Sequence, residues 1–177
     1  FRNISKKYSK IIICLKKNNY IFTPSKKITT MQHFKTLKEQ VIQWGLEKQI
    51  NNPVTQFGKV SEELNEICDE LTSKNGIILS KLKDAIGDTA VTLILLNHQE
   101  GRMSIFSEMK VLDVKDPLVA YRELFIAIAQ NDNRVFYMLN DLAEFFDTTL
   151  EECLSIAYDV ISKRTGETIN GQFYKSE

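Results

Sequence analysis

Hydrophobic residues recur along most of the chain at the spacing of three and four that is typical of helices. Phe34, Leu37, Val41 and Trp44 share one side of a helix predicted over residues 33–50. Almost no stretch alternates apolar and polar residues as a half-buried strand does. The same pattern predicts further helices at 53–74, 79–99, 117–132, 133–147 and 148–164. The sequence therefore predicts an all-α bundle of about five to six helices.

Local signals mark where several of these helices begin and end. Asn52 followed by Pro53 is typical of a helix N-terminus, and Thr149 with Glu152 has the spacing of a capping box. Residues 100–117 show no clear period and are predicted to be irregular. The tail, residues 165–177, contains an Asn-Gly pair and is predicted to form a loop or a small hairpin.

Composition narrows the class of protein without identifying it. The chain has 177 residues, of which 43% are hydrophobic and 26% charged, as expected for one globular domain with a hydrophobic core. Cys14, Cys68 and Cys153 are far apart, which indicates reduced thiols of a cytoplasmic protein and not a disulfide framework. No apolar run reaches the roughly 18 residues that a membrane span requires.

The net charge of zero conceals an uneven distribution. Residues 1–30 hold one arginine, seven lysines and no acid, so the remainder carries 15 basic residues (23 less 8) against 23 acidic ones. Such a basic arm is typical of attachment to nucleic acid or a membrane surface. Alternatively, Met31 is the natural start, residues 31–177 are the domain, and no nucleic acid or membrane is bound. We expect the second arrangement.

Glutamates follow one flank of the hydrophobic stripe in the helix predicted at 53–74. Glu63, Glu66 and Glu70 lie beside the stripe, whereas Glu62 and Asp69 point further outward. Like charges at these spacings repel one another by a few tenths of a kcal/mol per pair. A solvated acidic face is one explanation, and a bound cation is the other. The stripe itself consists of Phe57, Val60, Leu64, Ile67 and Leu71.

The sequence of the helix predicted at 79–99 favours the second explanation, a bound cation. Apolar residues cover nearly every side of it, so Asp88 is expected to be buried, at a cost of several kcal/mol unless it is paired or metal-bound. Asp84 lies one turn earlier, and Gly87 suggests close approach by a neighbouring backbone or a ligand. A salt bridge would satisfy Asp88. Alternatively, two antiparallel helices bring Glu63, Glu66 and Asp88 around Mg²⁺, for which Mn²⁺ could substitute.

The acidic motifs also carry a family resemblance. "EELNE" followed by "DAIGD" resembles the EExxE…ExxD pattern of MazG-like nucleoside triphosphate pyrophosphohydrolases, in particular the small proteins of phages and low-GC bacteria. The blocks "EQVIQWGLEKQI" and "TLEECLSIAYDVISKRTGETINGQFYK" are similar to the entry helix and the tail of those proteins. The resemblance covers residues 34–99 and 149–175, and leaves 100–148 as a helical insertion.

The resemblance implies a Mg²⁺-dependent hydrolase that cleaves nucleoside triphosphates, the deoxy forms among them, to monophosphate and pyrophosphate. Members are helical bundles that form homodimers or homotetramers. It implies metal ligation by Glu63, Glu66 and Asp88, with Glu62 in the leading position of the motif and available, with the other glutamates, as a catalytic base. The Glu of ExxD falls on Ala85 here, and Asp84 is the carboxylate that could replace it.

Other residues are candidates for holding the substrate. Lys59 precedes Glu63 by one turn, and Lys81 and Lys83 precede Asp84, although most such lysines are solvated surface charges. By their position in the family pattern, Lys163 and Arg164 at the end of the last helix are candidates for binding the phosphates. Asp159, one turn earlier, is a candidate for orienting them.

Aromatic residues allow similar alternatives. Trp44 is either a core anchor or, with Phe34, a surface for the base, and Gln56 is a candidate partner for base or sugar. The aromatic residues of 100–148 are expected in the core or an interface, with a lid as the alternative. His33 and His98 have no partner at catalytic spacing, and no phosphate-binding glycine loop is present. The alternative function is a non-catalytic helical module that binds nucleotide or protein and has lost a metal ligand at Ala85.

Overall fold

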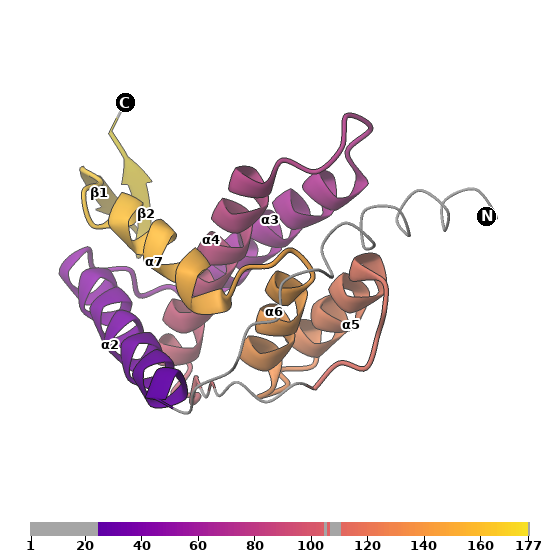
Figure 1. Ribbon diagram of the computed structural model, residues 1–177. Coiled ribbons are helices and arrows are strands. Elements are labelled where there is room, and N and C mark those ends of the chain that lie inside the picture. The colour runs from indigo at the N-terminus through magenta and orange to yellow at the C-terminus, as the bar shows by residue number, and fades with distance from the viewer. Residues whose placement is uncertain (1–24, 105, 107–110, 177) are drawn as a thin grey trace.

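The computed structural model describes residues 25–104, 106 and 111–176, and side chains from residue 32 onward. This part of the chain forms six helices and one two-stranded hairpin, which confirms the predicted all-α class (Figure 1). The helices are α2 (Ser25–Glu47), α3 (Pro53–Thr72), α4 (Leu79–Gln99), α5 (Pro117–Ala129), α6 (Val135–Glu144) and α7 (Leu150–Ile161). The strands are β1 (Gly166–Ile169) and β2 (Gln172–Lys175), which pair antiparallel.

Helix α2 begins earlier than the periodicity predicted, at Ser25 instead of residue 33. It therefore extends past the expected boundary at Met31. The proposed basic arm lies mostly outside the described residues, and its role stays a prediction. Cys14 also lies outside them, whereas Cys68 and Cys153 are free thiols, as expected. No helix in the described part of the chain is long and apolar enough to cross a membrane.

The predicted caps are present, one of them in part. Asn52 Oδ1 accepts hydrogen bonds from the backbone amides of Val54 (3.1 Å) and Thr55 (3.3 Å), and this caps α3. Thr149 Oγ1 accepts from the Glu152 amide at 3.1 Å. The second half of the predicted capping box was wrong, because the Glu152 carboxylate instead accepts hydrogen bonds from the Lys83 ammonium at 2.6 Å and the Thr148 hydroxyl at 2.9 Å.

Helix α4 is the centre of the bundle. It packs most extensively against α3 and α7, and also against α2 and α6 (Figure 1). Gly87 permits the close packing against α7, since a Cβ at this position would lie 2.3 Å from the Cys153 carbonyl oxygen. The expected close approach at Gly87 is therefore confirmed, and its partner is a neighbouring backbone.

The insertion brings aromatic and polar residues into the core. Phe136 of α6 is fully buried, as expected for a core residue. Phe34 of α2 packs against Phe106 and Phe136, with ring centroids 4.6 and 5.9 Å apart. Phe34 is thus a core residue, and the suggestion that it stacks on a base was wrong. Asp141 is buried and accepts hydrogen bonds from two backbone amides of the segment before α5.

One residue of the predicted stripe on α3 departs from it. Val60, Leu64 and Ile67 are buried, but Phe57 is 46% exposed. Its neighbour Gln56 takes the inward place, is 5% exposed, and donates from Nε2 to the Thr92 carbonyl of α4 at 3.2 Å. The first turn of α3 therefore faces α4 with an amide where the pattern predicted a phenyl ring.

Candidate functional site

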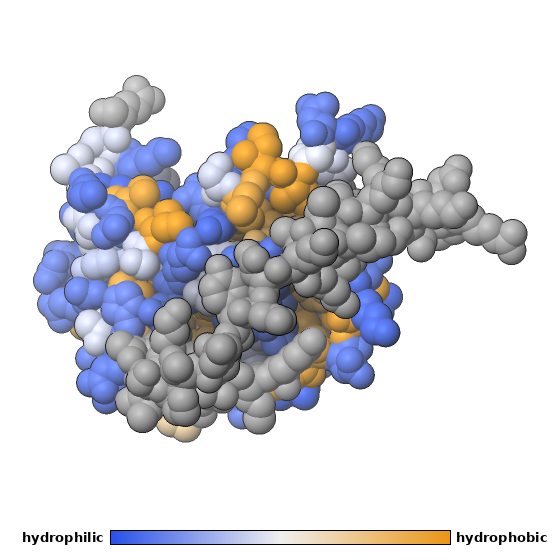
Figure 2. All heavy atoms as spheres, in the orientation of Figure 1, coloured by the Kyte–Doolittle hydropathy of each residue, from blue (hydrophilic) through white to orange (hydrophobic). Residues whose placement is uncertain are grey.

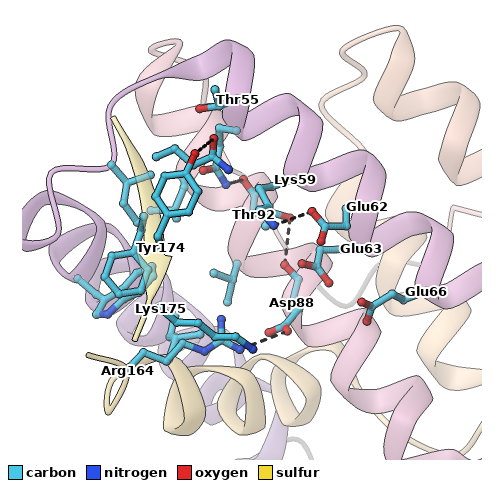
Figure 3. Close-up of a pocket in the computed structure, with 18 residues that line it drawn as sticks. Thr55, Lys59, Glu62, Glu63, Glu66, Asp88, Thr92, Arg164, Tyr174 and Lys175 are labelled. Carbon is cyan, nitrogen blue, oxygen red and sulfur yellow. Dashed lines mark hydrogen bonds and ion pairs between the residues drawn. The ribbon is translucent and has the colours of Figure 1, made fainter. Parts of the chain in front are cut away.

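A cavity of about 450 Å³ opens between α3, α4, the end of α2, the residues after α7 and the hairpin (Figure 3). This volume is within the range of pockets that hold small molecules. Its wall is chemically divided. One side carries carboxylates and the other aromatic side chains, with three cationic side chains among them.

The packing of α3 against α4 places the acidic residues of both sequence motifs in this wall. Glu62, Glu63 and Glu66 come from α3 and Asp88 from α4, and all four line the cavity. In Figure 3 the Glu63 side chain lies between Glu62 and Glu66 and near Asp88, whose carboxylate points toward Arg164. Glu70 does not join them, because its carboxylate accepts a hydrogen bond from the Ile78 amide at the start of α4.

Burial and mutual repulsion disturb the ionisation of two of these acids. Burial, followed by the charges of Asp88, Glu66 and Glu62, raises the pKa of Glu63 to about 7. Burial also raises the pKa of Asp88 to about 6, against the opposing effect of Arg164. The positive charges of Lys59 and Arg164 therefore compensate these two carboxyls only in part. Such an environment favours a cation, and perturbed carboxyls in a cleft are typical of functional sites.

The donor set fits one kind of cation better than others. Among the described residues, no three acidic, histidine or cysteine side chains lie close enough to form a metal-binding group. Mg²⁺ seldom needs such a cage, because it keeps several waters and is held by one or two carboxylates together with substrate phosphates. Glu63 and Asp88, with Glu66 beside them, match that requirement in chemistry and number.

Ala85, which occupies the motif position of the missing Glu, and its neighbour Asp84 both lie outside the cavity wall. Ala85 is 3% exposed and belongs to the core. Asp84 is exposed and is not part of the cavity wall, although its charge contributes to the raised pKa of Asp88. The structure therefore does not bring Asp84 to the place that a substitute ligand would occupy.

Three cations lie in the wall, and two of them pair with its acids. Lys59 Nζ is 2.6 Å from Glu62 Oε2, and a guanidinium nitrogen of Arg164 is 3.9 Å from Asp88 Oδ2 (Figure 3). The salt bridge that the sequence offered as an alternative for Asp88 thus exists, at the longest distance of its kind among the described residues. Lys175, on the hairpin, is the third cation.

Other candidate cations and their neighbours are outside the cavity. Lys163 follows α7, which ends at Ile161, and is exposed, as is Asp159. Neither lines the cavity, and Asp159 makes no ion pair with Lys163 or Arg164 within the described chain. Lys81 is exposed and lies outside the cavity wall. Lys83, also outside it, pairs with Glu152.

Trp44 fits both alternatives that the sequence left open. It is 8% exposed and part of the core, yet it lines the cavity. Its ring contacts Phe173 edge to face, with centroids 5.7 Å apart. Gln56 also lines the cavity, with its amide nitrogen held by Thr92.

Sequence reasoning missed the contribution of the hairpin. Gln172, Phe173, Tyr174 and Lys175 of β2 all line the cavity. The Asn170–Gly171 pair did predict a turn, and both residues have positive φ (52° and 78°) as a tight hairpin requires. No local signal indicates that this hairpin would lie against the cavity.

His33 has a partner that its sequence neighbours did not reveal. Its Nδ1 lies 2.5 Å from Glu151 Oε1 of α7. Neither residue lines the cavity, and His98 is exposed.

Comparison of the chain with protein-family models, curated proteins and solved structures finds no match. The resemblance to MazG-like proteins therefore remains a prediction that rests on the quoted motifs.

Proposed function

We propose that the protein hydrolyses nucleoside triphosphates to nucleoside monophosphate and pyrophosphate in the presence of Mg²⁺. The observation that carries this proposal is the pair Glu63 and Asp88, two carboxyls of raised pKa in a cavity whose wall also holds Arg164 and Lys175. Carboxylates that are only partly neutralised can hold the metal of a metal–triphosphate complex, and the cationic side chains beside them can bind its phosphates.

Each group in the wall has a role in this reaction. Glu63 and Asp88, with Glu66 beside them, would hold Mg²⁺, which when bound offsets negative charge on the phosphates. Arg164 and Lys175 bind phosphate oxygens, and the guanidinium can do so with two donors at once. The metal and the substrate together relieve the repulsion that the acids exert on one another in the free protein.

The chemical step is an in-line displacement at the α-phosphorus. A water oxygen forms a bond to this phosphorus, the bond to the bridging oxygen breaks, and pyrophosphate leaves with the electron pair. A carboxylate not engaged with the metal accepts the proton of the water. Glu62, which lines the cavity and among the described residues pairs only with Lys59, is the candidate base.

Product identification tests the proposal directly. The full chain is incubated with the eight common nucleoside and deoxynucleoside triphosphates and Mg²⁺ or Mn²⁺, and the products are separated by ion-exchange chromatography. We expect monophosphate and pyrophosphate, and loss of turnover in Glu66→Gln. Asp69→Asn is the matched control, because Asp69 is exposed on the same helix and outside the cavity wall. Orthophosphate with nucleoside diphosphate, or no turnover, contradicts the proposal.

The second candidate is a module that binds nucleotide or a protein without hydrolysing anything. The apolar Ala85 and the ion pair that Arg164 makes with Asp88 favour it. Calorimetry separates the two candidates. Nucleotide affinity that does not depend on Mg²⁺, together with no turnover, supports the module.

A homodimer or homotetramer is proposed on the resemblance alone. Apolar side chains are exposed at the start of α4 (Ile78 and Leu79) and on α7 (Ile156 and Val160). Figure 2 shows apolar groups near these elements, and a further one near α5. Sedimentation equilibrium of the full chain tests the assembly, and these residues are the first to substitute if it exists.

A further inference from the structure

The hairpin that closes one side of the cavity is held more firmly than its size would suggest. An isolated pair of four-residue strands is marginally stable in water. Here the Thr168 hydroxyl donates to the Lys48 carbonyl, and the Asn51 amide donates to the Gly171 carbonyl at 3.2 Å. Gly171 lies so close to Asn51 that a Cβ would be 2.3 Å from its Oδ1. The turn is therefore fitted against the end of α2 and the start of α3.

Strand β2, which follows this turn, is also held in place by contacts of its Phe173 side chain. Phe173 contacts the Trp44 ring edge to face, and Lys48 Nζ lies 5.5 Å from the centre of the Phe173 ring. These contacts fix β2 at the cavity wall. The side chains before and after Phe173 consequently have defined positions there.

Those two side chains have the chemistry to bind a flat heterocycle. Tyr174 lines the cavity although 48% of its surface is exposed, and its hydroxyl donates to Gln172 Oε1 at 3.2 Å. In Figure 3 Tyr174 lies across the cavity from Glu62, Glu63 and Glu66. A phenol ring offers a stacking surface to any base, and an amide offers both a donor and an acceptor to its edge.

A buried polar atom lies in the same part of the wall. Trp44 Nε1 is inaccessible to solvent and has no hydrogen-bond partner among the described residues. Unsatisfied buried donors are rare and costly, and a ligand is one of the ordinary reasons for them. A phosphate oxygen could also accept a hydrogen bond from this donor, but a phosphate chain cannot stack on the aromatic surface beside it.

We infer that the C-terminal hairpin is the base-recognition element of the cavity, with Tyr174 stacking on the nucleobase and Gln172 hydrogen-bonding its edge. The inference rests on the proposed function, because it concerns the nucleotide that this cavity is proposed to bind. It assigns the triphosphate to the acidic side and the base to the hairpin, so the substrate is a nucleotide with an intact heterocycle and not a simple polyphosphate.

Binding measurements test this assignment without any need for turnover. Trp44 is the one tryptophan of the sequence, so the fluorescence of the full chain reports directly on this part of the cavity. We expect nucleoside monophosphates to change the emission and inorganic pyrophosphate to leave it nearly unchanged. In calorimetry, Tyr174→Ala should weaken monophosphate binding about 10-fold or more, the scale of one stacked base, and should leave the affinity for pyrophosphate unchanged.

Matched variants distinguish a loss of base recognition from a general disturbance of the hairpin. Tyr174→Phe keeps the ring and should bind within about 3-fold of the parent, since it loses one exposed hydrogen bond. Gln172→Ala should weaken the binding of monophosphates that carry different bases by unequal factors. Ile169→Ala is the control, because Ile169 is on the same hairpin and exposed but outside the cavity wall, and it should bind as the parent does.

The outcomes distinguish this inference from the proposed function. Turnover that Tyr174→Ala and Gln172→Ala leave unchanged for every base overturns the inference and preserves the function. Equal losses for monophosphate and pyrophosphate in Tyr174→Ala also overturn it. Nucleotide binding that these variants weaken as expected, in a chain that hydrolyses nothing, supports the inference and contradicts the function.

Discussion

Asp141 and the pair Glu63 and Asp88 are carboxylates removed wholly or partly from water. They differ in how far the protein compensates their lost hydration. Asp141 of α6 is 4% exposed, and its Oδ2 accepts hydrogen bonds from the amides of Val111 (2.9 Å) and Leu112 (2.7 Å). Glu63 and Asp88 are less deeply buried, yet the charges of other acids act on each of them, and the nearest cation to Asp88 is 3.9 Å away.

The difference separates a structural role from a functional one. Asp141 supplies an acceptor to two amides that would otherwise be buried without partners, so it connects the segment before α5 to α6. Glu63 and Asp88 supply nothing of this kind to the fold. Their burial and mutual repulsion cost stability, and we propose that a bound cation offsets this cost. Substitutions in Asp141 and in the Glu63–Asp88 pair should therefore have opposite effects on stability and on activity.

The largest expected effect is on turnover. Asp88→Asn should lower the rate of pyrophosphate release at least about 100-fold, the scale of losing one group that stabilises developing charge, while the melting temperature does not fall. A coupled pyrophosphate assay and calorimetry measure the two quantities. Asp84→Asn should keep most of the rate, because Asp84 is exposed and outside the cavity wall. Equal losses in both variants would return Asp84 to the ligand set.

Asp141→Ala should show the reverse pattern. Two buried amides lose their acceptor, and we expect the free energy of unfolding to fall by about 2–3 kcal/mol. Urea denaturation measures this change, and the rate per folded molecule should be retained. Asp141→Asn keeps one acceptor oxygen and should lose less. If Asp141→Ala unfolds at the parent's urea concentration, the contrast between the two sets of carboxylates does not hold.

The elements of the fold were predictable because their signals are local. The Asn52 cap, the Asn170–Gly171 turn and the period of α4 each depend on residues within a few positions of one another. The acids of the site were predictable for the same reason, since Glu63 and Glu66 share one flank of one helix. A solvated acidic face would have produced the same pattern, so the cavity itself did not follow from it.

The remaining features depend on contacts between distant segments. Gln56 is buried in place of Phe57 because its amide reaches Thr92 of α4, and no property of α3 alone distinguishes the two. Phe34 is in the core because Phe136 lies against it. The hairpin contributes to the cavity because its turn docks where α2 and α3 meet, which the sequence of the hairpin does not encode by itself.

A smaller effect is expected from pH. The pKa of Glu63 in the folded protein is about 7, above its ordinary value of 4.5, so the folded state holds this proton more tightly than the unfolded state does. Its contribution to stability is full below the unfolded pKa and is lost as the pH rises through about 7. Without divalent ions, the chain should therefore become less stable between pH 5 and pH 8.

Glu63→Gln isolates this contribution. We expect the variant to exceed the parent in free energy of unfolding by about 1 kcal/mol at pH 8, a figure reduced because the side chain still reaches solvent, and by less at pH 5. Urea denaturation in a chelating buffer at both pH values measures it. Parallel losses in parent and variant would show that Glu63 is not under the repulsion inferred from its surroundings.

The smallest effect expected is stabilisation by Mg²⁺ alone. An ion that binds the folded chain and not the unfolded one, present at about three times its dissociation constant, adds about 0.8 kcal/mol of stability. For a chain of this size that amounts to a rise in melting temperature of about 2–3 °C. Differential scanning calorimetry measures it, with sodium chloride at equal ionic strength as the control. Asp88→Asn should abolish the rise, whereas Asp141→Asn should keep it, because only Glu63 and Asp88 are proposed to need a cation. A rise of the same size in Asp88→Asn would place the ion elsewhere on the chain.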